Sequence, residues 1–140
     1  MKEMKYETSY CCKILDKGKI KEFKWVILSL GTHPTAYIGL SKSHPYYKKH
    51  YDYININCHG GLTFSSETIT RELSFINETK KASKDIWWIG WDYTHSGDYT
   101  GYLNPQKNLD NKKWTTKEIK TEVISVIKQL DIKKIVANIL

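Results

Sequence analysis

The chain of 140 residues has no long apolar run and contains little proline, cysteine or arginine. No stretch approaches the roughly 20 apolar residues that cross a bilayer. The opening residues, Met1 to Tyr6, contain no apolar segment of the kind that a secretory leader carries. We therefore expect a cytoplasmic protein that does not bind a membrane.

Cysteine is scarce as well, and its placement argues against disulfides. The chain has three cysteines, an odd number, and Cys11 and Cys12 are adjacent. Such spacing is a poor disulfide framework and is typical of a reducing compartment.

Arginine is almost absent, because Arg71 is the single arginine among 22 basic residues. Proteins that read DNA sequence depend on arginine for bidentate contacts with guanine. We therefore do not expect nucleic acid to be the partner. The net charge of +7 leaves two interpretations open. It is either a solvated lysine surface or a positive field that attracts a small anion such as a nucleotide.

Aromatic residues, in contrast, are abundant, with ten tyrosines, five tryptophans and three phenylalanines. Disordered chains lack such residues, and this length fits one domain. Residues 1–140 are therefore predicted to form a single compact α+β domain, mainly an antiparallel sheet with a packed C-terminal helix.

Apolar runs and alternating patterns predict the elements of that domain. Thr115 and Glu118 form a capping box, which predicts a helix beginning there. Residues 132–140 could form a last helix, a strand or a subunit contact, and 66–84 have no clear pattern. The predicted strands are 5–15, 25–30, 35–40, 52–59, 62–65 and 86–93; a turn is expected at 16–19, a short helical turn at 43–45 and a loop at 94–111.

A first polar cluster follows the predicted strand 52–59 and contains His59, Gly60, Gly61 and Thr63. Two glycines permit positive φ and close approach of a ligand. Successive backbone N–H groups there could form a nest for a phosphate. A histidine beside them could donate to that phosphate, exchange protons or bind a metal. The plainer alternative is a tight turn with a histidine packed beside it.

A second cluster surrounds the end of the predicted strand 86–93 and contains Trp88, Asp92, His95 and Asp98. Tryptophan can stack a purine, although a tryptophan on a strand is more often part of the core. The acidic residues and the histidine could bind ribose hydroxyls or a base edge, or orient a general base. Their spacing matches no standard metal signature, so we expect neither a metal nor a cofactor.

A third cluster, from His44 to Tyr51, interleaves aromatic and basic residues. Tyr46 and Tyr51 could form the rim of a pocket, where tyrosine stacks on a ligand and lysine meets a phosphate. The alternative is a surface turn with aromatic packing.

The order of these motifs resembles a family of small bacteriophage and prophage proteins. The resemblance rests on the stretch from His59 to Thr63 and on the stretch from Trp88 to Asp98, which ends in His-Ser-Gly-Asp. It covers roughly residues 25–130. Phe64 stands where the family usually has tyrosine, and Trp91 where it usually has phenylalanine. The resemblance implies an anti-defence protein that acts on a nucleotide-derived immune signal of the host.

Three functions follow as hypotheses. The first is sequestration of such a signal, cyclic ADP-ribose-like or a cyclic nucleotide, in an aromatic and basic pocket of a homo-oligomer. The second is a hydrolase or phosphodiesterase in which His59 and His95 exchange protons with Asp92 or Asp98. The third is a basic surface that binds a host protein or a nucleic acid, which makes no use of the two polar clusters.

Overall fold

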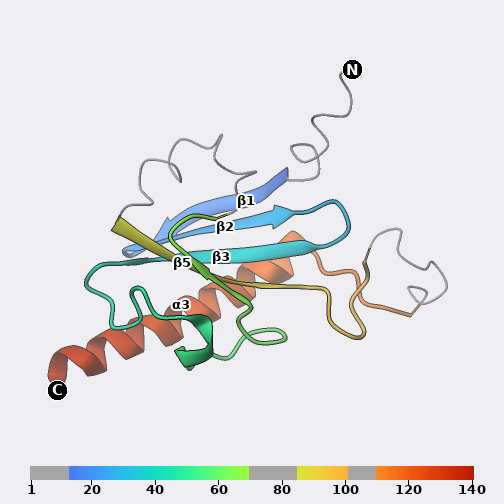
Figure 1. Cartoon of the computed structure of the whole chain (residues 1–140). Helices are drawn as coiled ribbons and strands as arrows, with labels where there is room; N and C mark the ends of the chain where they lie inside the picture. Colours follow the sequence, from blue (N-terminus) through green and yellow to red (C-terminus); the bar gives the residue numbers. More distant parts are fainter. Residues whose placement is uncertain (1–12, 70–84, 101–109) are drawn as a thin grey trace.

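The computed structural model describes residues 13–69, 85–100 and 110–140, in which one long helix lies across one face of a sheet (Figure 1). The described strands form a five-stranded antiparallel sheet in the order β1-β2-β3-β5-β4. This arrangement confirms the predicted α+β domain. The elements are β1 (Lys13–Ile20), β2 (Phe23–Ser29), β3 (Pro34–Ser41), β4 (Phe64–Ser66), β5 (Ile86–Asp92) and α3 (Thr116–Ile139).

The central strands are β2, β3 and β5, which the apolar runs predict correctly. Central strands are covered on both faces and therefore read as nearly continuous apolar sequence. The register between β3 and β5 places Thr35 opposite Asp92. The start of β3 and the end of β5 thus share one end of the sheet.

The two faces of the sheet bury different clusters, because side chains alternate along each strand. The larger cluster lies between the sheet and α3 and includes Trp25, Ile27, Ile38, Leu40, Ile89, Trp91 and Tyr93. The smaller cluster lies on the opposite face and includes Val26, Leu28, Tyr37, Ile69 and Trp88. The sheet therefore has a helix-covered face and a second apolar face.

Helix α3 begins where the capping box predicts. The Thr115 side chain accepts from the backbone N–H of Glu118, and the Glu118 carboxylate accepts from the backbone N–H of Thr115. The helix continues without a break to Ile139, so residues 132–139 belong to it. The helical prediction for this segment is therefore confirmed and the strand is wrong, whereas a subunit contact stays a prediction.

The turn predicted at residues 16–19 is wrong, because β1 runs through it. Gly18 lies opposite Trp25 in the register, and a Cβ on this glycine would come within 2.8 Å of the Trp25 ring. Glycine here admits a close side chain and does not turn the chain. The chain reverses further on, where Lys21 takes a φ of 54°.

The strand predicted at residues 52–59 is also wrong, although its alternation is real. Tyr51–Tyr53 form the 3-10 helix η1. Beyond it Ile54 and Ile56 are buried, while Asn57 pairs with a side chain of α3. Its N–H donates to Gln129 Oε1 at 2.8 Å and its carbonyl accepts from Gln129 Nε2 at 2.8 Å. The segment is extended, but a helix side chain takes the place of a neighbouring strand.

Two smaller expectations complete the comparison. Residues 43–45 lie in hydrogen-bonded turns, one of which is closed by the bond from Tyr47 N to His44 O. They do not form a helix. The strand predicted at 62–65 corresponds to β4, shifted by one or two residues. The vicinal cysteines Cys11 and Cys12, residues 70–84 and the middle of the predicted loop, 101–109, lie outside the described residues.

Candidate functional site

The first polar cluster forms a tight turn that follows the extended segment. Gly61 N donates to Cys58 O at 2.9 Å, and Gly60 and Gly61 take φ values of 69° and 84°. Such backbone angles favour glycine. The turn places His59 and Gly60 against the loop that follows β5.

Asp98 is the centre of the polar network in that loop. It is only 4% exposed, and its Oδ2 lies 2.7 Å from His59 Nε2. Its carboxylate also accepts from Trp114 Nε1 at 2.8 Å and from the backbone N–H of His95 at 3.0 Å. Burial alone raises the pKa of Asp98, but the bonds from these three donors outweigh it and hold the pKa below its ordinary value.

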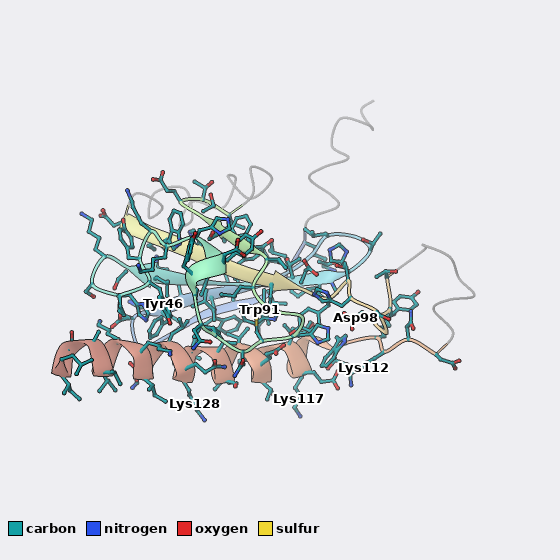
Figure 2. All side chains as sticks on the ribbon, turned by 60° about the horizontal axis from the view of Figure 1, so that its bottom comes forward. Tyr46, Trp91, Asp98, Lys112, Lys117 and Lys128 are labelled. Carbon is teal, nitrogen blue, oxygen red and sulfur yellow. The ribbon has the colours of Figure 1, made fainter. Side chains whose placement is uncertain are left out.

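His59 also contacts Tyr93 and Glu122, which contact each other. Its ring stacks on Tyr93 with 4.7 Å between ring centroids and 10° between planes. The Tyr93 hydroxyl donates to Glu122 Oε1, and the other oxygen of Glu122 accepts from His59 N at 2.7 Å. Burial, and then the bond to Glu122, raise the pKa of Tyr93. Strand β5, the glycine turn and α3 are thereby tied together, with Asp98 at one end of these contacts, near the start of α3 (Figure 2).

His95 has one buried ring nitrogen, although 34% of its side chain is exposed. Its Nε2 lies 3.2 Å from Asp92 Oδ1, yet it is buried and makes no aligned hydrogen bond with a described residue. We interpret the contact as an ion-pair distance without hydrogen-bond alignment. A Cβ on Gly60 would lie 2.0 Å from the same nitrogen. His95 therefore packs directly on the Gly60 backbone, which explains the glycine.

Asp92 connects this network to a pocket. Its Oδ1 accepts from Thr94 N at 3.2 Å and Thr94 Oγ1 at 2.7 Å, and its Oδ2 accepts from Thr63 Oγ1 at 3.2 Å. The pocket has a volume of about 200 Å³ and lies at the end of the sheet. Its lining residues are Leu30, His33, Thr35, Tyr37, Thr63, Phe64, Trp91 and Asp92.

Two polar residues of this pocket escape the sequence analysis. Thr35 is 4% exposed, and its Oγ1 is buried without a hydrogen-bond partner among the described residues. His33 has its pKa lowered by burial, and the negative charge of Asp92 opposes this shift in part. His33 lies between the predicted strands 25–30 and 35–40, and Thr35 begins the second of them. The signal that could have found them is the antiparallel order, which brings the start of β3 to the end of β5.

The remaining predicted residues lie elsewhere. Trp88 is 2% exposed and belongs to the core cluster on the sheet face away from α3. Tyr46 lies at the end of the molecule opposite Asp98 (Figure 2), where its hydroxyl accepts from Asn55 N at 3.4 Å. Tyr51 stacks on His50 at 4.1 Å, and its N–H donates to Ser65. None of the three lines the pocket.

The proposed phosphate nest is poorly placed to bind an anion. The backbone N–H groups of His59, Gly61 and Thr63 donate to Glu122, Cys58 and Gly90 respectively. Alternate amides of the stretch are therefore already used within the fold.

Cys58 is equally unsuited to attack a substrate. Burial, together with the nearby Glu122 charge, raises the pKa of its thiol to about 12. The thiolate is the nucleophilic form of cysteine, so this residue stays an inert thiol at neutral pH.

The described residues contain no group of three or more histidine, cysteine or acidic side chains placed to hold a metal ion. Within the same residues, no helix has the length and apolar character to cross a membrane. Comparison of the chain with family models, with curated proteins and with solved structures gives no match.

Proposed function

We propose that the protein binds the nucleoside part of a nucleotide-derived small molecule in the pocket at the end of β3 and β5. We further propose that it holds this ligand without cleaving it. The observation that carries the proposal is Thr35, a residue that lines the pocket and whose hydroxyl is buried with no hydrogen-bond partner among the described residues. Burying an unpaired hydroxyl costs roughly 1–3 kcal/mol, and a ligand that bonds to it recovers this cost.

The polar groups around Thr35 suit a hydroxyl-bearing ring. Among the described residues, Asp92 Oδ2 accepts one hydrogen bond, from Thr63, and a carboxylate oxygen can accept about two. A carboxylate is the group that binds ribose hydroxyls in many nucleotide sites. His33, on the same lining, can donate or accept according to its tautomer. The pocket lining therefore offers both acceptors and donors to a sugar ring.

The apolar lining suits an aromatic base. Phe64 is partly exposed, lines the pocket and meets Tyr37 edge to face at 5.2 Å and 79°, so the Phe64 ring can contact a flat ligand. A pocket of about 200 Å³ is smaller than the roughly 300–1,000 Å³ that encloses a whole drug-sized ligand. It accommodates one part of a nucleotide rather than a complete cyclic dinucleotide.

Phosphate groups are expected to stay outside this pocket. Its lining contains no lysine or arginine, and Asp92 would repel an anion. The sequence predicts a pocket that is both aromatic and basic. The proposed pocket has an aromatic lining, but no lysine or arginine side chain lines it. The net charge of +7 then acts at long range, by attracting the charged ligand to the molecule.

Binding is favoured over catalysis because of where the two histidines point. His59 Nε2 is bonded to Asp98, and His95 Nε2 lies beneath Gly60. Neither histidine lines the pocket. A hydrolase remains the second candidate because a histidine at 2.7 Å from a buried carboxylate has the geometry of an oriented general base.

The biological setting is a further part of the proposal. The resemblance of the two motifs to small phage proteins supports an anti-defence role, in which a homo-oligomer sequesters a host immune signal in the bacterial cytoplasm. Removal of a free signal requires tight binding but no chemistry, which agrees with a pocket that neither His59 nor His95 lines.

The test is calorimetric titration with adenosine, a cyclic ADP-ribose isomer and a cyclic dinucleotide, followed by heat denaturation and mass analysis of the released ligand. We expect adenosine to compete with any nucleotide that binds, and the ligand to emerge intact. Asp92→Asn should weaken binding about tenfold, whereas Thr121→Val on the exposed face of α3 should leave it unchanged. A converted ligand would instead establish the hydrolase. Binding of phosphate-bearing ligands without competition by adenosine would refute the nucleoside pocket.

A further inference from the structure

The last turns of α3 carry their apolar side chains on the side away from the protein. Up to Leu130 the buried residues of the helix recur at helical spacing and face the sheet. The next position along this face is Lys134, whose Nζ lies 2.6 Å from both carboxylate oxygens of Glu22. The face that packs on the body therefore changes from apolar to charged after Leu130.

The opposite face of α3, which faces away from the sheet, becomes apolar over these last turns. Ile132, Ile135, Val136 and Ile139 recur at i, i+3, i+4 and i+7, which places them on one side of the helix. They are 59%, 50%, 47% and 75% exposed. We call these four residues the C-terminal stripe. In both views the helix end that bears them extends past the strands (Figures 1 and 2).

We propose that the C-terminal stripe is a contact between two copies of this chain, with the two helices antiparallel. A stripe with this spacing is complementary to another copy of itself, and a twofold axis pairs identical patches. This contact goes beyond the ligand pocket, which lies at the end of the sheet and shares no residue with it.

Charge selects the antiparallel arrangement. Residues 135–140 carry no charged side chain, whereas Lys128 and Lys133 lie towards the start of the stripe. A parallel pair would place each lysine beside its own counterpart. An antiparallel crossing near Ile135 and Val136 brings the uncharged segments together and keeps the lysines of the two copies apart.

A second copy fits the stripe better than a lipid surface does. A helix that lies on a membrane keeps its basic residues on the face opposite the apolar one and usually adds large aromatic residues. Here Lys128 lies one turn before Ile132 on the same face of the helix. Figure 2 shows Lys128 on the side of α3 away from the sheet. The stripe itself contains no aromatic residue.

The size of the stripe implies a weak dimer. Even if both stripes were fully covered, they would bury somewhat less than about 1,000 Å² in total, which is the lower limit of specific interfaces. We therefore expect a dissociation constant on the order of 10–100 μM. Because each copy has a net charge of +7, added salt should tighten the dimer by screening repulsion.

The test is sedimentation equilibrium of the full chain over a concentration series at low and high salt. The variants are Ile135→Lys and the matched control Asn138→Lys, which adds the same charge to an exposed position beside the stripe. We expect a monomer–dimer equilibrium that salt strengthens. Ile135→Lys should weaken it at least about tenfold, and Asn138→Lys should change it about twofold or less.

Other outcomes would overturn the proposal. A chain that stays monomeric throughout, or an Ile135→Lys variant that dimerises like the parent, shows that the stripe is no self-contact. Sedimentation with vesicles of phosphatidylcholine and phosphatidylserine provides the other arm. Vesicle binding that Ile135→Lys abolishes and high salt weakens, without a dimer, would assign the stripe to a lipid surface instead.

Discussion

Replacement of Thr35 by valine should stabilise the protein and weaken its ligand binding at the same time. The Thr35 side chain lies on β3 opposite Asp92, and its Oγ1 is buried without a partner among the described residues. Valine has nearly the same shape, keeps the β-branched form that suits a strand, and removes the hydroxyl.

The magnitude follows from the cost of burying that hydroxyl. Mutational data place this cost at roughly 1–3 kcal/mol, and part of it is relieved by the neighbouring pocket space. We therefore expect Thr35→Val to raise the free energy of unfolding by about 1 kcal/mol. For a domain of this size the gain corresponds to an increase in Tm of about 3 °C. Loss of one hydrogen bond to the ligand should weaken binding roughly 5–10-fold.

The assay combines thermal unfolding with calorimetric titration, and Thr35→Ser serves as the control. Serine keeps the hydroxyl but removes a buried methyl group, which costs about 1 kcal/mol. The two variants should therefore move stability in opposite directions, and only valine should weaken the ligand. If Thr35→Val lowers the free energy of unfolding by 1 kcal/mol or more, the hydroxyl supports the fold and the reasoning about the pocket fails.

Three further predictions concern the polar network. Gly60→Ala should destabilise the fold by about 1–3 kcal/mol more than Gly61→Ala, because both glycines have positive φ but only a Cβ on Gly60 meets His95; equal thermal stabilities would contradict this. The lowered pKa of Asp98 contributes stability that is complete above the unfolded value of about 3.9 and is lost as pH falls through the folded value. Acid titration of stability should therefore be less steep in Asp98→Asn, and an unchanged slope would exclude this role. Tyr93→Phe should cost about 1–3 kcal/mol in denaturant unfolding, since it leaves Glu122 and the Trp91 indole without the shared hydroxyl; a neutral effect would show that the bonds add nothing.

The sequence predicts the elements well wherever one local rule decides them. The apolar run after Trp25 gives a central strand, and the capping box at Thr115 gives the start of α3. The rules fail where a partner distant in sequence changes the outcome. Gly18 looks like a turn residue because nothing local shows the Trp25 ring that lies over it. Alternation at residues 52–59 indicates an extended chain, but it does not show that Gln129 is the neighbour.

The same limit applies to the candidate site. Sequence patterns bring His59, Asp92, His95 and Asp98 to attention, and the structure places all four in one network. They do not show that His59 Nε2 is bonded to Asp98 or that His95 Nε2 is buried. Thr35 carries no local sequence signal, because a threonine on a strand is ordinary. Its importance arises from burial, which only the folded chain reveals.

The paired hydrogen bonds between Asn57 and Gln129 have a consequence for motion. Among the described residues no strand pairs with the segment that leads to the glycine turn, so the backbone bonds of Asn57 and His59 depend on side chains of a docked α3. If the helix detaches, Asn57 and His59 lose the acceptors of their N–H groups in the same event. Amide hydrogen exchange at these two residues should therefore follow the opening of the helix rather than that of the sheet. The turn that packs against His95 and the helix that supports it thus form one cooperative unit.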